Sequence, residues 1–208
     1  RTKQAIRVLK NACETNKQPW PWQRLAVMLK EEGRNDEADL ALKIALSYIR
    51  QNEFAISWKM HHQRAEIAAL QNNKEETAIE TYLAQEARKA GGWGLSKEQR
   101  RFLGEDQSKI ESEIRRLKDQ DYKTVLKQMY PKYLNAKKEW MEKTAVPAVV
   151  INIEKENRYG FAKDQNGRSI YIGRELLTGN IEKGKQIKIA VVQTIDKKKG
   201  KKAWKAVW

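Results

Sequence analysis

Two short stretches near the carboxyl end decide the fold of this chain: Asn157 to Ala162 (NRYGFA) and Ile170 to Gly173 (IYIG). Both alternate as β-strands do, with successive side chains on opposite faces. Tyr159 and Phe161 therefore share one face, and Tyr171 stands opposite to its isoleucine neighbours. Exposed rings in a basic segment suit stacking on unpaired bases. The pattern predicts a platform for single-stranded nucleic acid.

The residues around these stretches resemble the cold-shock domain family, whose paired strands carry a Lys-Gly-aromatic-Gly-aromatic-Ile motif and then a Val-Phe-Val-His motif. Tyr159 to Phe161 matches the first motif, Ile170 to Ile172 matches the second, and the resemblance covers Pro147 to Trp208. Ribosomal-protein-type RNA-binding OB domains share these features. The resemblance implies a small five-stranded OB β-barrel that binds single-stranded RNA or DNA on an aromatic face. Asn152 and Gly173 stand where the family has a Trp and the final His, which implies fewer stacking groups.

An alternative interpretation places the three rings in the barrel core, because small barrels use aromatic side chains as filler. The alternation argues against it, since the strands supply an apolar interior without the rings. A further strand is predicted from Gln186 to Thr194, after a glycine turn at Lys183 to Lys185. The predicted interior consists of Ile151, Ile153, Ile170, Ile172, Ile187, Ile189 and Val191.

The charge of the chain predicts a polyanionic partner. Lys and Arg number 42 against 27 Asp and Glu, a net charge of +15. Residues 145–208 hold 14 basic and 6 acidic side chains, so the excess is denser there than in residues 1–144, which hold 28 and 21. The run Lys197 to Lys202 is predicted to be a hairpin loop that either is a solvated turn or follows a phosphate backbone. Trp204 and Trp208 fit either the core or its rim.

The predicted nucleic-acid-binding residues combine stacking rings with nearby cations. They are Tyr159, Phe161, Tyr171, Lys155, Arg158, Lys163, Arg174, Lys198, Lys199, Lys201 and Lys202.

Upstream, the chain resembles the tetratricopeptide family, with the spacing W-x2-L-small-x2-apolar and then A-x3-apolar-x2-A around a turn at Gly33. Alanine signatures also begin at Ala5, 33 residues before Ala38, and at Ala78, 40 residues after it. The resemblance implies stacked helical pairs, with an insertion in the longer interval. The residues expected between two antiparallel helices are Trp22, Leu25, Leu29, Ala38, Leu42 and Ala45.

The segment from Ser96 to Lys143 is predicted to be further helix, kinked or ended at Pro131, with a short hinge from Glu142 to Pro147. The predicted fold class is α+β and multidomain. A tetratricopeptide-like array spans 1–95, a helical extension or cap and hinge spans 96–145, and a cold-shock-like OB barrel spans 146–208.

No catalytic, metal or cofactor site is predicted, so the chain is not expected to be an enzyme. The adjacent His61 and His62 cannot place both rings on one helical face and are interpreted as packing residues. The acidic pair Glu75 and Glu76 is interpreted as solvated or capping charge. The single cysteine, Cys13, excludes an intramolecular disulfide, and no apolar run approaches the ~20 residues of a membrane helix. A cytoplasmic location without membrane contact is expected.

Three functions fit these patterns. The first is an adaptor whose barrel binds single-stranded nucleic acid while the helical repeats dock a protein partner. The second is a protein scaffold whose barrel binds no nucleic acid. The third is an accessory subunit that binds single-stranded DNA in a DNA-processing or defence assembly. Stacking does not distinguish RNA from DNA, and RNA is favoured because the resembled families more often bind it.

Overall fold

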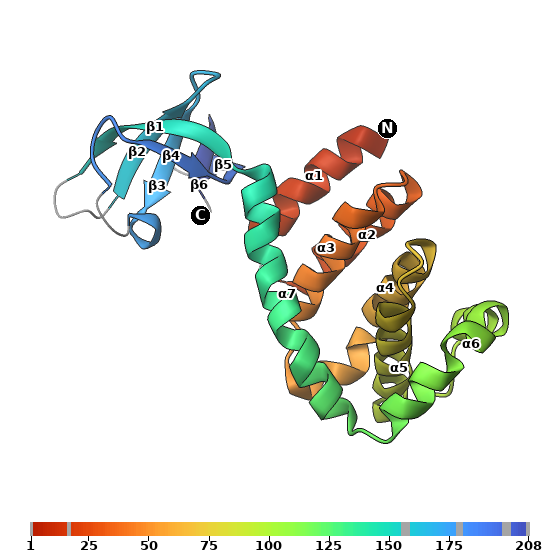
Figure 1. The fold of residues 1–208 in the computed structure, drawn as a ribbon. Helices are drawn as coiled ribbons and strands as arrows, with labels where there is room; N and C mark the ends of the chain where they lie inside the picture. The colour runs from red at the N-terminus through yellow and green to blue at the C-terminus, as the bar shows by residue number, and fades with distance from the viewer. Residues whose placement is uncertain (1, 16–17, 155–158, 178–180, 197–200, 207–208) are drawn as a thin grey trace. The chain divides into compact units, whose positions relative to one another are not determined.

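The computed structural model describes residues 2–15, 18–154, 159–177, 181–196 and 201–206. Helices come first and strands follow, so the fold is α+β (Figure 1). The chain forms two compact units, residues 1–137 and 138–208. Within the described ranges, no helix combines the length and apolar character needed to cross a membrane.

The first unit is built from helices that are consecutive in the chain and pack as neighbours (Figure 1). Its elements are α1 (Thr2–Thr15), α2 (Pro19–Glu31), α3 (Asn35–Ser47), the 3-10 helix η1 (Gln51–Ser57), α4 (Trp58–Leu70), α5 (Lys74–Ala90), α6 (Lys97–Lys118) and the first part of α7 (Tyr122–Thr144).

Tight turns close the pairs α2–α3 and α4–α5. Gly33 follows α2 with φ of +73°, as the sequence predicts for a turn residue, and Asn72 follows α4 with φ of +57°. This left-handed conformation lets the next backbone N–H reach back to an exposed helix carbonyl. The Arg34 N–H donates to the Leu29 oxygen, and the Asn73 N–H donates to the Ala68 oxygen, both at 2.9 Å. Both helical pairs therefore reverse direction in the same way.

The residues predicted to lie inside the first complete pair are buried, which confirms that part of the sequence analysis. Trp22 is 2% exposed, and Leu25, Leu29 and Ala38 are fully buried. The longer interval before Ala78 also has a structural origin. The seven residues of η1 lie between α3 and α4, which accounts for the seven extra positions in that interval.

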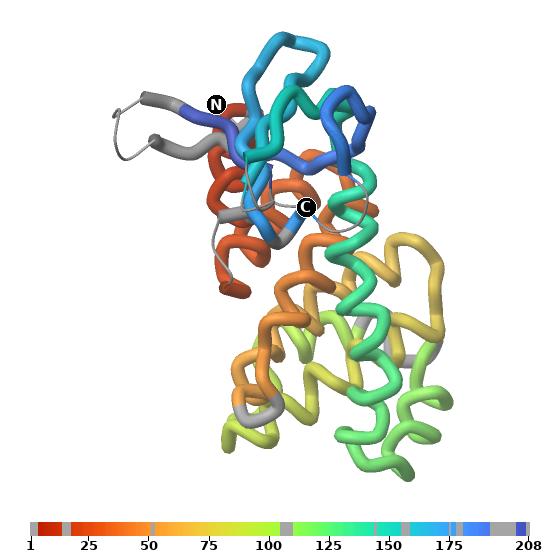
Figure 2. Tube along the Cα trace, turned by 90° about the vertical axis from the view of Figure 1, so that its left-hand side faces the viewer, coloured from red at the N-terminus to blue at the C-terminus, as the bar shows by residue number. Residues whose placement is uncertain are grey.

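The two helices after the pairs are joined by the short segment 119–121 (Figure 2). Ser96 and Gln99 form a capping box at the start of α6, in which each side chain bonds the other residue's backbone N–H. Of the two predicted effects of Pro131, a kink or an end of the helix, the end is wrong, because α7 continues through it to Thr144. Of the residues expected to form a hinge, Glu142 to Pro147, all but Ala145 lie in α7 or in the first strand.

The second unit contains a mixed sheet with six strands in the described ranges. The strand order is β4-β1-β2-β3-β6-β5, and every pairing is antiparallel except β3 with β6. The predicted strand from Gln186 is divided at Ala190, so β4 and β5 are consecutive in the chain yet occupy the two ends of the strand order. The strands are β1 (Val146–Ile153), β2 (Tyr159–Asp164), β3 (Ser169–Gly173), β4 (Gln186–Ile189), β5 (Val191–Asp196) and β6 (Lys201–Ala206), with the 3-10 helix η3 (Arg174–Leu176) after β3.

The core of this unit differs from the one that the sequence predicts. Ile151 is 40% exposed, so its predicted place in the core is wrong. Ala148 and Val150 face the core, so alternation puts Ile151 on the outer face, and the pairing of β1 with β2 shifts between Val150 and Asn152, which leaves Asn152 exposed as well. Trp204 packs against the core while remaining half-buried. The buried core residues are Ala148, Ala162, Ile170, Ile172, Ile189 and Ala206, and Ile187 and Val191 pack against them.

Candidate nucleic-acid interface

Three aromatic rings form one contiguous cluster on β2 and β3. Tyr159 and Tyr171 stack with ring centroids 5.8 Å apart and an interplanar angle of 25°. Phe161 meets each of them edge-on at 5.9 Å. Both tyrosines are 36% exposed, and Phe161 is half-buried. The rings thus lie at the surface, where a flat ligand can reach the two tyrosines.

The strand register explains why the rings converge. Phe161 and Tyr171 are directly opposite each other in the antiparallel pair, and Tyr159 lies opposite Gly173. Cross-strand neighbours on one face have Cβ atoms close enough for aromatic contact. On the other side of β2, Phe161 pairs with Asn152 of β1. Asn152 and Gly173, the positions where the resemblance expects further stacking groups, therefore lie beside the cluster and carry no ring.

Gly160, between the two β2 rings, is required by the close approach of β1. A Cβ atom built on Gly160 would lie 2.9 Å from the backbone oxygen of Asn152. Real Cβ atoms do not approach a carbonyl oxygen that closely, and a paired strand cannot move aside without breaking its ladder. The middle residue of the Tyr-Gly-Phe motif is thus set by backbone packing, while its flanking rings face outward.

The turn between β2 and β3 is held by Asp164. One carboxylate oxygen accepts the backbone N–H groups of Asn166 and Arg168, at 3.0 and 2.9 Å. The other oxygen accepts the Arg168 guanidinium at 2.5 Å. The same guanidinium carbon lies 4.4 Å from the centre of the Trp204 ring on β6. These contacts hold the hairpin that presents the rings.

The structure describes only some of the predicted basic residues. Lys163 follows the rings on the same face of β2 and is exposed, and Arg174 is exposed at the start of η3. Lys201 and Lys202 pair with Asp196 and Ile195 at the start of β6, so their predicted place in a loop is wrong. The ladder extends further toward the hairpin end than the apolar pattern indicates. Lys155, Arg158, Lys198 and Lys199 lie outside the described residues.

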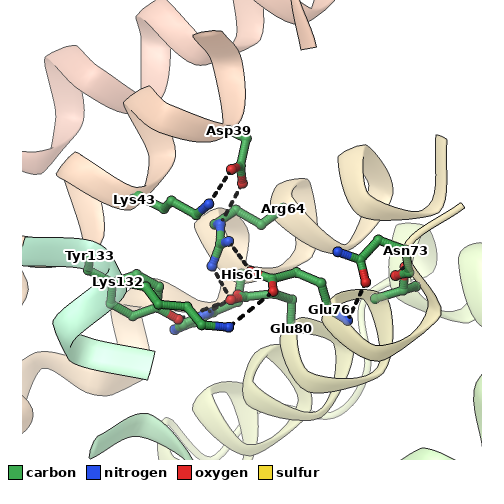
Figure 3. Close-up of polar contacts among 10 residues, drawn as sticks. Asp39, Lys43, His61, Arg64, Asn73, Glu76, Glu80, Lys132 and Tyr133 are labelled. Carbon is green, nitrogen blue, oxygen red and sulfur yellow. Dashed lines mark hydrogen bonds and ion pairs between the residues drawn. The ribbon is translucent and has the colours of Figure 1, made fainter. Parts of the chain in front are cut away.

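A buried ionic cluster in the first unit was not anticipated from the sequence (Figure 3). Arg64 on α4 is 1% exposed. Its guanidinium donates to three carboxylates on other helices: Asp39 on α3 at 2.8 Å, Glu76 on α5 at 2.5 Å, and Glu80 on α5. The interpretation of Glu76 as a solvated charge is therefore wrong. Three helices meet at one cation.

Glu80 is the second centre of this cluster. It also accepts the Tyr133 hydroxyl of α7 at 3.0 Å and contacts Nδ1 of His61 at 2.7 Å. Lys43 pairs with Asp39 at 2.6 Å, and Lys132 pairs with Glu76 at 3.4 Å. Three carboxylates thus face three permanent cations without any charge on His61. The sequence signal that could have revealed this cluster was the spacing of its residues. His61 and Arg64 share one face of a helix, and so do Glu76 and Glu80.

The cluster shifts the pKa values of its members. Burial alone would raise the pKa of the Glu80 carboxyl, but Arg64 and then His61 outweigh burial and hold that pKa below its usual range. Burial likewise opposes the effect of Arg64 on Asp39, and the pKa of Asp39 is lowered. Burial and the neighbouring Glu80 raise the pKa of Tyr133 well above its usual value. Glu80 and Asp39 are therefore ionised and the Tyr133 phenol is protonated at neutral pH.

The two adjacent histidines contact different neighbours, as their helical positions predict. His61 lies 6.0 Å from Phe54 and 6.2 Å from Tyr133, measured between ring centroids. His62 instead meets Phe102 edge-on at 5.6 Å. Over the described ranges, no three His, Cys, Asp or Glu side chains are grouped as a metal site would require.

Comparison of the chain with protein-family models, curated proteins and solved structures finds no match.

Proposed function

We propose that this chain is an adaptor that binds single-stranded nucleic acid, with RNA as the favoured ligand, on the face of β2 and β3. The observation that supports this proposal is the contiguous surface cluster of Tyr159, Phe161 and Tyr171. Rings of this kind stack on bases of any sequence, each stacked base contributing about 1–3 kcal/mol. The exposed Lys163 beside them supplies a phosphate contact.

We propose further that the second unit is an OB barrel. Its support is the strand order, in which the outermost strands β4 and β5 are separated by only Ala190 in the chain. One continuous segment thus pairs with β1 at one end of the sheet and with β6 at the other. The OB resemblance assigns its ligand to a strand face of this kind. A net charge of +15 favours an anionic ligand.

The protein-docking half of the proposal concerns the helical unit, which we propose to be a tetratricopeptide-like array. Its support is the repeated helical hairpin, closed in both cases by a left-handed residue, with small alanines buried between the helices. Stacked pairs of this kind present extended surfaces to protein partners. Nucleic acid and protein would then be held by separate units.

The direct test is a titration of the full chain against single-stranded RNA, single-stranded DNA and duplex oligonucleotides at two salt concentrations. Phe161→Ala is expected to weaken single-strand binding by roughly 5- to 150-fold, since a stacking partner is removed from the centre of the cluster. Fluorescence anisotropy with labelled oligonucleotides measures it. Equal binding of duplex would contradict the proposal, and no binding at either salt would favour the scaffold alternative. Preference for single-stranded DNA would favour the DNA-processing alternative.

Lys163→Gln serves as the contrast within the same titration. It removes one phosphate contact, so the slope of log affinity against log salt should fall by about 0.7. Phe161→Ala should leave that slope nearly unchanged while lowering affinity at both salt concentrations. If Lys163→Gln changes neither slope nor affinity, the phosphate path runs elsewhere.

Asn152→Trp is expected to increase single-strand affinity. Asn152 is exposed, lies beside Phe161 and stands where the resembled family has a stacking Trp. One more stacked base should strengthen binding by roughly 5-fold or more. The control is Asn152→Leu, which adds apolar area without an aromatic face. A gain of the same size in both variants would show that stacking is not its cause.

A further inference from the structure

The first unit contains a pocket of about 440 Å³ where the end of α3, η1, α4 and the first half of α7 meet. Its volume lies in the range of sites that hold small organic molecules. The lining has a floor of buried and half-buried side chains and a mouth of exposed ones, and the two parts differ in chemistry.

The floor of the pocket is apolar. Leu46 and Phe54 are each 3% exposed, and Ile49 is 9% exposed. Leu126 of α7 is half-buried and completes this surface. The Phe54 ring stacks on Tyr122 with centroids 4.6 Å apart, which holds it in place. A ligand on this floor gains free energy by removing apolar surface from water.

Three polar side chains also line the floor, and their polar groups are directed at other residues. The Ser57 hydroxyl donates to the Phe54 oxygen at 2.6 Å, and the Tyr133 hydroxyl donates to Glu80 at 3.0 Å. His61 is 0% exposed, with Nδ1 at 2.7 Å from Glu80. Glu80 is not a lining residue. A ligand in the pocket therefore meets only apolar surface at the floor.

The mouth of the pocket is basic. Its lining residues are the exposed Arg50, Lys127, Tyr130 and Pro131. No acidic side chain is among the described lining residues. The carboxylate of Glu53 accepts the backbone N–H of Arg50 at 3.3 Å, outside the lining. Two cations thus stand at the opening above an apolar floor.

This arrangement complements an amphiphilic anion. Its apolar body enters the floor, while its charged group stays at the mouth, because a charge taken into apolar surroundings loses its hydration at high cost. At the mouth the charge is both hydrated and attracted by the guanidinium and the ammonium. A second charged group on the ligand would have to occupy the floor, so one head group fits.

We propose that this pocket binds a small organic acid in its anionic form. An aliphatic or aromatic body fills the floor lined by Leu46, Phe54 and Leu126, and a single acidic head group meets Arg50 and Lys127. This inference goes beyond the proposed function and does not depend on nucleic-acid binding.

The experiment is calorimetric titration of the full chain with acetate, hexanoate, octanoate and octanamide. Affinity should rise by about fourfold for each CH₂ group between hexanoate and octanoate, since each is buried on the floor. Octanamide, which lacks the charge, should bind about three- to tenfold more weakly than octanoate. Octanoate that binds no better than acetate, or no better than octanamide, would overturn the proposal.

Variants test the floor and the mouth separately. The double variant Arg50→Gln/Lys127→Gln should lower octanoate affinity to that of octanamide and leave octanamide binding unchanged. Lys89→Gln, at a side chain that is 79% exposed on α5, is the control and should change neither. Leu126→Trp fills the pocket and should abolish binding of both. If octanoate binds the double variant as it binds the wild type, the site is refuted, whether or not Leu126→Trp folds.

A protein segment is the alternative occupant. A terminally blocked peptide with glutamates around one central leucine should bind more weakly than octanoate, because ordering a flexible peptide opposes binding. Tighter binding of this peptide, lost in the double variant, would assign the pocket to an acidic partner segment and overturn the small-acid proposal. Failure of octanoate to bind leaves the nucleic-acid proposal standing, since that proposal rests on the rings of β2 and β3.

Discussion

Replacing Arg64 by Met is expected to lower the free energy of unfolding of the helical unit by about 3–5 kcal/mol. Arg64 is 1% exposed and bonds Asp39, Glu76 and Glu80 at once. Met fills a similar volume, so the loss arises from the electrostatics. Glu80, which is fully buried, would keep only Tyr133 and His61 as partners. A buried carboxylate without its main cation is among the most destabilising changes available to a core.

Chemical denaturation followed by far-ultraviolet circular dichroism measures this effect, because the helices dominate that signal. The matched control is Arg115→Met, in which the lost ion pair with Glu111 is on the surface and the arginine side chain is 74% exposed. A surface pair of this kind contributes about 0–1 kcal/mol. If the two variants lose similar amounts, the buried cluster does not stabilise the fold.

The same cluster sets an acid limit on stability. The pKa values of Glu80 and Asp39 are lowered in the folded chain, so their contribution is fully present above their unfolded pKa values near 4. It is lost as pH falls through the lower, folded values. The wild type should therefore lose stability steeply below about pH 4. The Arg64→Met variant should show a flatter acid limb, since the cation that depresses both pKa values is absent.

Replacing Trp22 by Ala is expected to cost about 3–5 kcal/mol of unfolding free energy. Trp22 lies on α2 and is only 2% exposed, so its removal leaves a large cavity in the first complete helical pair. We expect no loss of nucleic-acid binding, because Trp22 is a packing residue of the first unit.

Trp20→Ala is the matched control for this prediction. The two tryptophans lie two positions apart on α2, and Trp20 is 45% exposed. Its truncation should cost less than about 1 kcal/mol, since surface substitutions seldom cost more. The same denaturation measurement decides the outcome. Equal losses in both variants would mean that the two sites are equally well packed.

The local sequence pattern was sufficient to predict whether a side chain is buried or exposed where this depends only on its own strand or helix. Alternation placed Tyr159 and Phe161 on the outer face of β2 and the isoleucines Ile170 and Ile172 of β3 in the core, because strand periodicity is a property of the backbone. The small residues of the repeat signature, such as Ala38 and Ala45, are buried for a similar reason: helical periodicity and side-chain size are both legible in sequence. Gly33 was identifiable because few residues adopt its left-handed turn.

Tertiary structure decided the features that depend on which strand or helix a residue packs or pairs with. The bulge that interrupts the alternation of β1, so that Ile151 and Asn152 are both exposed, arises in the pairing of β1 with β2, and the sequence of β1 contains no sign of it. The division of the strand at Ala190 likewise follows from its pairing with two different strands.

The charged residues show the same limit most clearly. Arg64, Glu76 and Glu80 read as ordinary helix charges, because an acidic or basic residue is usually solvated. Only the packing of α3, α5 and α7 around α4 removes water from Arg64 and joins it to Glu80, 16 positions away. The pocket lined by Leu46, Phe54 and Leu126 arises in the same way, where α3, η1 and α7 meet. Sequence therefore determined which faces are apolar, and the tertiary structure determined which polar groups those faces enclose, since burial of a charge depends on residues distant in the chain.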